Sequence, residues 1–135
     1  MKKNICIVVA NYYPAVSKDL IAGASKVLNR IGIKTFKKII VPGVFEIPFT
    51  ISKNINNYDA FIALGCLIKG ETPHFDLISK ASINAIMNLS VVYKKPIGNG
   101  IITCLSKKQA LSRSNPQKKD KGGETAKAVL SVLEI

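Results

Sequence analysis

The chain has 135 residues, of which 47% are hydrophobic and 21% are charged, and its formal net charge is +12. This length and composition predict one globular domain over residues 1–135 and exclude a disordered chain. They also argue against a membrane protein, because no apolar run approaches the length of a membrane span.

The positive charge has three explanations: a nucleic-acid partner, a small anionic substrate, or a general lysine-rich composition. The third accounts for most of the 20 basic residues. Proteins that bind single-stranded nucleic acid combine basic residues with aromatic rings. No aromatic residue follows Tyr93, although the most basic segment is 107–121, so we expect no nucleic-acid partner and favour a small anion.

The three cysteines, Cys6, Cys66 and Cys104, are odd in number and scattered, and they form no Cys-x-x-Cys pair. This usage predicts reduced thiols in a cytoplasmic protein. It argues against a disulfide framework or a zinc site, so we expect no metal.

Short apolar runs alternate with segments of helical period, which is typical of an α/β fold whose parallel sheet is covered on both faces. Strands are expected over residues 5–10, 35–41, 60–64 and 97–103. Helices are expected over about 17–31, 45–51, 75–89, 107–113 and 124–133. Gly32 fits the position just past the first helix, while Thr72 is the expected N-cap and Pro73 the expected first residue of the helix near 75–89.

In such a sheet, the segments that follow the strands meet at the edge formed by the carboxyl ends, and ligands bind there. Three of these segments are 11–14, 42–46 and 65–74. The last ends at His74, the one histidine of the chain, at a junction of strand, loop and helix that suits a proton-transfer group. No serine or cysteine nucleophile motif accompanies His74. A general acid–base role with a nucleophile supplied by the substrate therefore fits better than a hydrolase triad.

An anion site is expected beside His74. The backbone N–H groups of Glu71 and Thr72 precede a helix and could cradle a phosphate, although ordinary helix capping explains them equally well. Arg113 and Lys121 are the candidate cations, but a solvated basic loop is the commoner fate of such residues. The segment lacks the Gly-Lys-Ser/Thr of a nucleotide-hydrolysing loop.

Three other residues each have a functional and a structural interpretation. Tyr12 could lay its ring on a planar ligand or pack at a strand end. Glu46 could accept hydrogen bonds from a polyol or an amine, or it could favour the start of a helix. For Cys66 the structural interpretation is preferred, because nothing nearby marks it as a thiolate.

Three motifs resemble a known family in order and spacing. They are Val41-Pro-Gly-Val-Phe-Glu-Ile-Pro48, Gly65-Cys-Leu-Ile-Lys-Gly-Glu-Thr-Pro-His74 and Asp120-Lys-Gly-Gly-Glu124. Together with residues 96–103 they resemble the 6,7-dimethyl-8-ribityllumazine synthase family of riboflavin biosynthesis, over nearly the whole chain. The resemblance implies a flavodoxin-like three-layer α/β/α sandwich with a four-stranded parallel sheet. It also implies a transferase that condenses 5-amino-6-(D-ribitylamino)uracil with 3,4-dihydroxy-2-butanone 4-phosphate, two small-molecule substrates, without a cofactor.

The resemblance implies a role for each matching residue. Tyr12 would stack on the pyrimidine, and His74 would transfer protons. Contacts to the pyrimidine and its ribityl chain would come from Val44, Phe45, Glu46, Cys66, Leu67, Ile68, Asn99 and Lys121. Phosphate would be held by Glu71, Thr72 and Arg113. In the family Arg113 and Lys121 come from a neighbouring subunit, so the site would lie between chains.

Three features depart from the family pattern. Tyr12 stands where many members have Phe, which keeps a stacking ring. Asn99 stands where many members have an aromatic residue from the adjacent subunit, so stacking is expected from one side. The chain begins almost at its first strand, without the N-terminal extension of many members. The expected assembly is a pentamer, with a sixty-subunit shell built from pentamers as the alternative.

Two other functions stay open from the sequence. An archaeal-type riboflavin synthase resembles the same fold, but it has no phosphate substrate to explain Thr72 and Arg113. A non-catalytic flavin- or lumazine-binding shell protein would keep the stacking ring and would not need His74.

Overall fold

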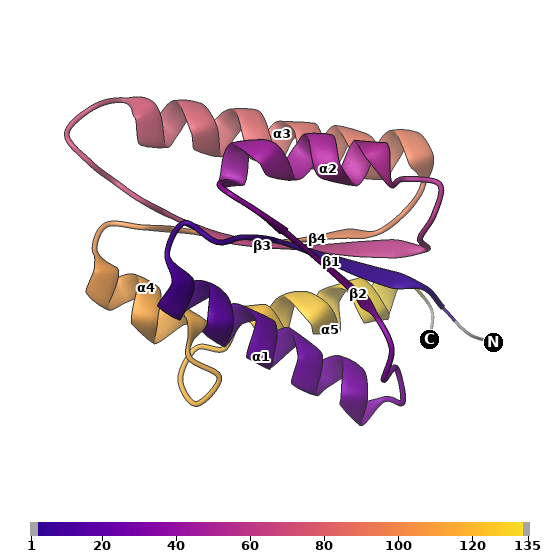
Figure 1. Cartoon of the computed structure of the whole chain (residues 1–135). Helices are drawn as coiled ribbons and strands as arrows, with labels where there is room; N and C mark the ends of the chain where they lie inside the picture. The colour runs from indigo at the N-terminus through magenta and orange to yellow at the C-terminus, as the bar shows by residue number, and fades with distance from the viewer. Residues whose placement is uncertain (1–2, 134–135) are drawn as a thin grey trace.

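The computed structural model describes residues 3–133 and contains a single parallel sheet with helices on both faces (Figure 1). The strands are β1 (Ile5–Ala10), β2 (Lys37–Val41), β3 (Ala60–Ile68) and β4 (Ile97–Cys104). The helices are α1 (Pro14–Arg30), α2 (Ile47–Lys53), α3 (His74–Tyr93), α4 (Lys107–Ser114) and α5 (Lys121–Leu133), and a 3₁₀ turn, η1 (Val44–Glu46), precedes α2. None of the helices within 3–133 has the length and hydropathy of a membrane span.

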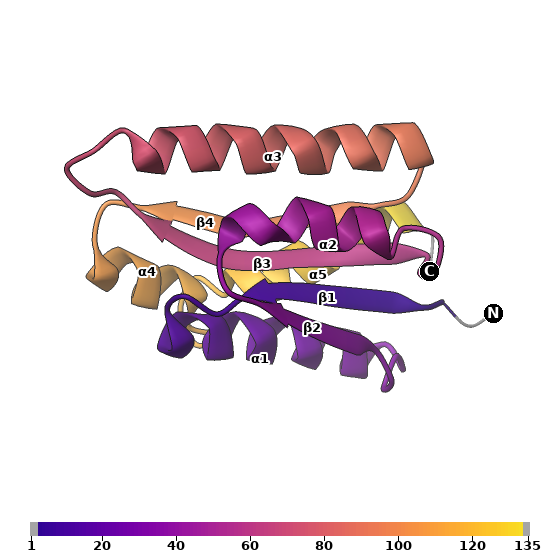
Figure 2. The same ribbon diagram turned by 45° about the horizontal axis from the view of Figure 1, so that its top comes forward.

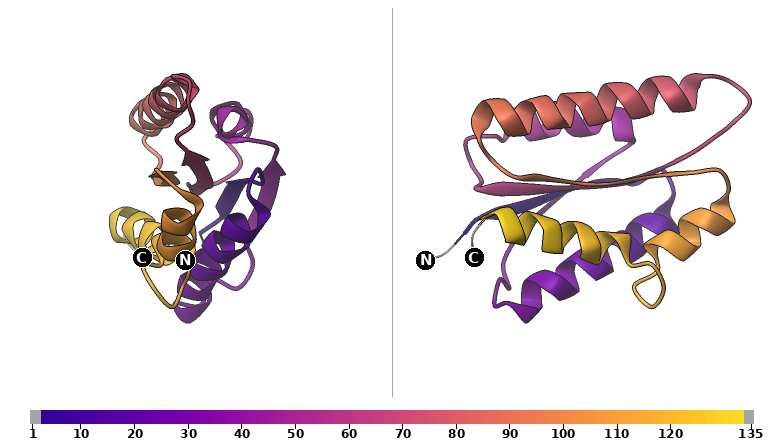
Figure 3. Two further views of the ribbon diagram at one scale, coloured as in Figure 1. Left: turned by 90° about the vertical axis from the view of Figure 1, so that its left-hand side faces the viewer. Right: turned by 180° about the vertical axis from the view of Figure 1, so that it is seen from behind.

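The strand order is β2-β1-β3-β4, and all three pairings are parallel (Figure 2). Helices α2 and α3 cover one face of the sheet, and α1, α4 and α5 cover the other (Figure 3). The predicted three-layer α/β/α sandwich with four parallel strands is confirmed. The chain leaves β1 for the edge strand β2 and returns to β3 on the other side of β1. The carboxyl ends of β1 and β3 therefore flank a topological switch point, where α/β proteins bind ligands.

Each face of the sheet has its own hydrophobic core, because successive side chains of a strand point to opposite faces. Ile5, Ile7 and Val9 of β1 pack toward α1 and α5, while Cys6, Val8 and Ala10 pack toward α2 and α3. All six β1 residues are buried, which explains why the sequence shows a continuous apolar run there rather than an alternation.

Two predicted boundaries need correction near His74. Strand β3 does not end at Leu64 but continues to Ile68, because Cys66 and Ile68 pair with Ile102 and Cys104 of β4. Helix α3 begins at His74, and its N-cap is Pro73 rather than Thr72. The prediction that Pro73 is the first helical residue is therefore wrong, because Pro73 immediately precedes the helix.

The other helices differ from their predicted ranges mainly at the ends. Helix α1 begins at Pro14 instead of near residue 17, and Ile31 lies outside it as the C-cap. Helix α3 runs on to Tyr93 rather than ending near residue 89, and α5 starts three residues early, at Lys121. Gly32 has φ +93, which confirms its predicted place just past α1, because this left-handed backbone favours glycine.

Candidate functional site

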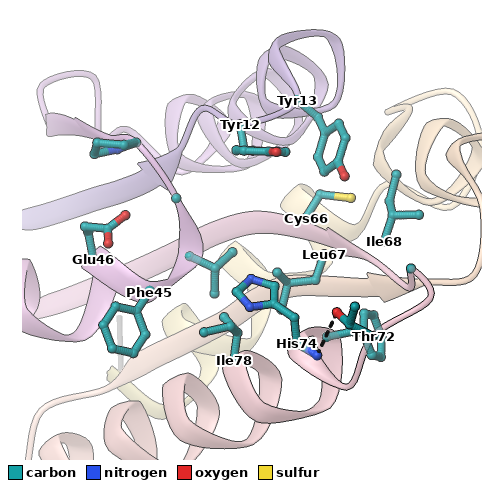
Figure 4. A pocket seen from close by; sticks show the side chains of 15 residues that line it. Tyr12, Tyr13, Phe45, Glu46, Cys66, Leu67, Ile68, Thr72, His74 and Ile78 are labelled. Carbon is teal, nitrogen blue, oxygen red and sulfur yellow. Dashed lines mark hydrogen bonds between the residues drawn. The ribbon is translucent and has the colours of Figure 1, made fainter.

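A cavity of about 600 Å³ opens at the carboxyl ends of β1, β2 and β3. It is lined by Tyr12, Tyr13, Pro42, Gly43, Val44, Phe45, Glu46, Cys66, Leu67, Ile68, Gly70, Thr72, His74, Phe75 and Ile78. Figure 4 shows these side chains around one hollow, with the labelled ones coming from the end of β1, from η1, from the last residues of β3 and from the start of α3. We call this space the main cavity.

His74 reaches the main cavity because it is the first residue of α3. Its backbone N–H donates to Oγ1 of Thr72 at 3.4 Å, a long bond that ties the loop to the helix start. The imidazole points into the hollow in Figure 4. The imidazole is thus exposed beside a substrate-sized cavity.

The stacking candidate also lies in this cavity. The ring of Tyr12 is 70% exposed, and it contacts Tyr13 edge to face, with ring centroids 5.0 Å apart and an interplanar angle of 76°. On the other side of the cavity, η1 exposes Phe45 and Glu46 while it buries Val44 against the sheet. The cavity thus combines an aromatic wall with one carboxylate and one imidazole.

Two acids in the cavity wall have raised pKa values. Burial, together with the proximity of Cys104 on the neighbouring strand and a hydrogen bond with it, raises the pKa of the Cys66 thiol to about 12. Burial also raises the pKa of the Tyr13 hydroxyl, with smaller contributions from Cys66 and Tyr12. Cys66 is therefore a neutral thiol, which agrees with the structural interpretation and not with a nucleophile.

A second, smaller pocket of about 190 Å³ lies along β4. It is lined by Asn99, Gly100, Ile101, Ile102, Thr103, Arg113, Lys121 and Thr125. We call it the β4 pocket. Strand β4 pairs with β3 alone, so its other side is a free sheet edge, and this pocket opens there.

The three predicted site residues in the β4 pocket have defined contacts. Arg113 donates from Nη1 to the Thr103 carbonyl oxygen at 2.9 Å, which holds the guanidinium against the strand. Lys121 forms an exposed ion pair with Glu124 at 3.3 Å, an arrangement that contributes little stability. Asn99 accepts a hydrogen bond from the Ile101 N–H at 3.1 Å and so covers one backbone donor of the free edge.

The motif 120–124 positions this basic group. Asp120 lies just before α5 with φ 48, and its Oδ1 accepts a hydrogen bond from the Gly123 N–H at 3.2 Å. A Cβ on Gly122 would lie 2.1 Å from the Leu20 carbonyl oxygen, so only glycine allows α5 to pack this closely on α1. The two glycines therefore fix the start of α5, and with it Lys121.

The structure thus divides the predicted site residues between two places. Nine of them line the main cavity: Tyr12, Val44, Phe45, Glu46, Cys66, Leu67, Ile68, Thr72 and His74. Asn99, Arg113 and Lys121 line the β4 pocket instead. Glu71 is exposed and lines neither space. None of the described residues that line the main cavity is a lysine or an arginine.

Two cavity residues, Phe75 and Ile78, lie outside the segments predicted for the site. A helical signal was available for Ile78, because it lies four residues after His74 and so shares its helix face. Tyr13 lies within the predicted segment 11–14 and lines the cavity. Among residues 3–133 there is no group of three or more His, Cys, Asp or Glu side chains that could hold a metal ion.

Comparison with known proteins identifies the family. The sequence model of the 6,7-dimethyl-8-ribityllumazine synthase family matches residues 2–135. The chain belongs to this family. A 6,7-dimethyl-8-ribityllumazine synthase of Agrobacterium fabrum is 40% identical over 99% of this chain and 95% of its own length. One of Methylorubrum extorquens is 40% identical over 97% of this chain and 79% of its own.

A further relative, 6,7-dimethyl-8-ribityllumazine synthase 1 of Rhodopseudomonas palustris, is 41% identical over 97% of this chain and 84% of its own length. The protein is an enzyme of riboflavin biosynthesis with lumazine synthase activity. This finding decides against the archaeal-type riboflavin synthase and against the non-catalytic shell protein.

Proposed function

We propose that the main cavity binds both substrates of the condensation and that the β4 pocket of a second copy completes it. The substrates are 5-amino-6-(D-ribitylamino)uracil and 3,4-dihydroxy-2-butanone 4-phosphate. The products are 6,7-dimethyl-8-ribityllumazine, phosphate and water. The observation that carries this proposal is the separation of His74 from Arg113 into two different cavities of one chain.

The pyrimidine substrate suits the aromatic and apolar part of the main cavity. The Tyr12 ring offers a flat surface for the pyrimidine, and the last residues of β3, Cys66 to Ile68, lie beside it with their backbone groups. Glu46 beside Phe45 in the cavity lining has a carboxylate that can accept hydrogen bonds from the hydroxyl groups of a ribityl chain. This supports ribityl contacts for Val44, Phe45 and Glu46.

The phosphate substrate needs positive charge that the main cavity does not supply. A phosphate ester carries about −1.5 to −2 charges at neutral pH. The main cavity provides Thr72 and a helix start for it, but no lysine or arginine among the described lining residues. The β4 pocket has the opposite composition, with Arg113 and Lys121 and no acid in its lining. A guanidinium binds phosphate oxygens in pairs, so Arg113 is the proposed clamp.

The chemistry requires little more than these residues. The substrate amine attacks the ketone carbon, and water is lost to form an imine. Removal of the proton from the hydroxyl-bearing carbon then expels phosphate and leaves an enol, which takes up a proton at its terminal carbon to become a ketone. The second amine attacks this ketone carbon, and loss of a second water closes the ring. Both nucleophiles are already amines and phosphate is a good leaving group, so no cofactor is required. Holding the two substrates together contributes most of the rate. His74 is the proposed group that moves protons between the steps.

A shared site requires an oligomer, and the surface supports one. Helix α3 buries only Ser82 and Ile86, although it is 20 residues long and apolar. Exposed large apolar side chains gather on α3 and the neighbouring α2: Phe49, Leu77, Met87, Val91, Val92 and Tyr93. Apolar surface of this extent is typical of a subunit interface. We propose a homopentamer, or a sixty-subunit shell built from pentamers, of single-domain subunits in the cytoplasm.

The test is direct. Purified protein is incubated with both substrates, and lumazine absorbance is followed against the spontaneous reaction in buffer. The proposal predicts catalysis above the spontaneous rate by a protein whose gel-filtration mass is several times that of one chain. Catalysis at monomer mass would refute the shared site, and no catalysis by the assembled protein would refute the substrate assignment.

A further inference from the structure

We propose that Tyr13 is a positioning residue for this reaction, because its ring fixes the orientation of the Tyr12 ring that carries the pyrimidine. This inference rests on the proposed role of Tyr12 as the stacking platform. Tyr13 itself takes no part in the chemical steps, since it acts only by orienting the Tyr12 ring.

Tyr12 needs an external support. Its ring is 70% exposed, and it precedes α1 at the end of β1, outside the regular backbone of both elements. An exposed side chain in such a segment samples several rotamers. A platform that must receive a planar substrate loses affinity when the ring has to be ordered on binding. Something must therefore hold the ring before the substrate arrives.

Tyr13 is held much more firmly than Tyr12. It is the N-cap residue of α1, and its carbonyl oxygen accepts hydrogen bonds from both the N–H and the Oγ of Ser17, at 3.0 and 3.1 Å. The Ser17 hydroxyl is buried and also donates to the Ala10 carbonyl oxygen at 2.7 Å, which ties this turn to the end of β1. The Tyr13 ring itself packs against the core cluster beneath α1.

The contact between the two rings transmits this rigidity. Their centroids are 5.0 Å apart and their planes meet at 76°, the edge-to-face geometry that aromatic pairs prefer. Tyr13 is the one aromatic ring paired with Tyr12 among residues 3–133. In Figure 4 Tyr12 and Tyr13 lie side by side along the same wall of the main cavity, with Cys66 below them. One ring is anchored in the core and the other is presented to the ligand.

This arrangement matters more because the chain has Asn99 in its β4 pocket. Asn99 uses its side-chain oxygen on the Ile101 N–H, and an amide offers no ring for a substrate to stack on. When stacking comes from one side, the orientation of that one ring determines how well the pyrimidine is held.

The experiment separates the ring of Tyr13 from its hydroxyl. Tyr13→Phe keeps the edge-to-face pair, and Tyr13→Leu removes it. We expect Tyr13→Leu to raise the KM for the pyrimidine about two- to tenfold, because the loss of one aromatic pair corresponds to a change of this size. The dissociation constant of the product, measured by equilibrium dialysis, should rise by the same factor. Tyr13→Phe should stay within about twofold of the parent, and the KM for the butanone phosphate should stay constant in both. Loss of affinity in Tyr13→Phe equal to that in Tyr13→Leu would overturn the proposal, because the hydroxyl would then be the active group.

A double-mutant cycle shows whether Tyr13 acts through Tyr12. Tyr12→Ala should raise the pyrimidine KM by itself, and Tyr13→Leu should then have no further effect. Additive effects would overturn the positioning role. An unchanged KM in Tyr12→Ala would overturn the platform role of Tyr12, which is a failure of the proposed function and is visible in that single variant.

A matched control is available in the same chain. Tyr58 and Phe61 form another edge-to-face pair, with centroids 5.7 Å apart and an interplanar angle of 72°, at the opposite end of β3 from the cavity. Tyr58→Leu should lower the thermal midpoint as any lost aromatic contact does, and it should leave the pyrimidine KM unchanged. A rise in KM in Tyr58→Leu equal to that in Tyr13→Leu would show that the KM reports general destabilisation, and it would overturn the proposal.

Discussion

The main cavity and the β4 pocket contain complementary halves of one chemistry. The main cavity has an aromatic ring, an imidazole and a carboxylate, in Tyr12, His74 and Glu46, but no lysine or arginine among its described lining residues. The β4 pocket has Arg113 and Lys121 but no ring to stack on. A site for a planar amine and a phosphate ester needs both sets, and this supports the proposal that a complete site forms between two copies of the chain.

The two regions also differ in how the fold positions their side chains. The main cavity is built from strand ends and a helix start around the switch point of the sheet. The β4 pocket lies on a free sheet edge, and its two cations come from α4 and the first residue of α5. The difference predicts that changes in the first region alter the chemistry and that changes in the second alter phosphate binding.

The largest expected effect is that of His74→Ala. Kcat should fall by about 10- to 100-fold, because a general acid–base group is removed while the positioning of both substrates is retained. Lumazine absorbance at saturating substrates measures it. Asp76→Asn, in the exposed first turn of α3 and outside the cavity lining, is the control and should keep the parent rate. Equal rates for His74→Ala and the parent would remove the proton-transfer role.

Arg113→Ala changes the β4 pocket instead of the main cavity. The KM for the butanone phosphate should rise about tenfold or more, since charge-assisted hydrogen bonds to phosphate are lost, and the pyrimidine KM should stay nearly constant. Lys118→Ala, an exposed lysine outside the β4 pocket, serves as the control for net charge. A fall in kcat with an unchanged KM for the butanone phosphate would show that Arg113 does not act by binding the phosphate of the substrate.

Asn99→Ala should have a smaller effect. The Asn99 side chain accepts a hydrogen bond from the Ile101 N–H on the strand edge. A water molecule can accept that hydrogen bond when the amide is removed. We expect the KM of either substrate to change less than about threefold, because the free energy of one neutral hydrogen bond at the lower end of its usual range corresponds to a change of this size. Steady-state kinetics check this. A tenfold change would show that Asn99 contacts substrate directly and that the β4 pocket contributes more than charge.

The smallest expected effect is that of Cys66→Ala. Its turnover should stay within about twofold of the parent, because a buried thiol that remains protonated supplies no nucleophile or base to the reaction. Burial raises the Cys66 pKa from the ordinary value of 9.0 to about 12, so the folded protein has almost no thiolate at this position at pH 8. Iodoacetamide should label Cys66 only after unfolding, when the pKa returns toward 9.0. Fast labelling of the native thiol, followed by mass spectrometry, would contradict this.

Much of the fold was predictable because its signals are local. The continuous apolar run of β1, the helical period of α1 and the glycine at position 32 each report on their own neighbourhood. The end of β3 was not predictable in this way. Gly65 and the following residues read as a loop, and they become strand only because β4 pairs with them over its whole length. That pairing joins segments more than 30 residues apart.

The sequence predicted which strand ends lie together, but topology alone did not predict where the basic residues lie. Topology alone grouped the strand ends correctly, and His74 with Tyr12 and Glu46 line one cavity. Topology did not predict where Arg113 and Lys121 lie, because their positions depend on how α4 and α5 pack against β4 and α1. The segment 11–14 placed Tyr13 at this edge of the sheet, but the pairing of its ring with Tyr12 was not predictable. Its edge-to-face contact with Tyr12 depends on the turn that Ser17 closes, which no spacing in the sequence indicates.

If His74 of one copy and Arg113 of another serve the same site, as proposed, two variants that each lack one of these residues should complement each other. His74→Ala and Arg113→Ala chains are unfolded together in equal amounts and refolded into mixed assemblies, and lumazine formation is measured at low butanone phosphate. Random mixing restores both parent residues in about one site in four, one half for each residue, so activity should rise to about a quarter of the parent value. Activity that stays at the mean of the two separate variants would place both residues in a site within one chain and would contradict the account.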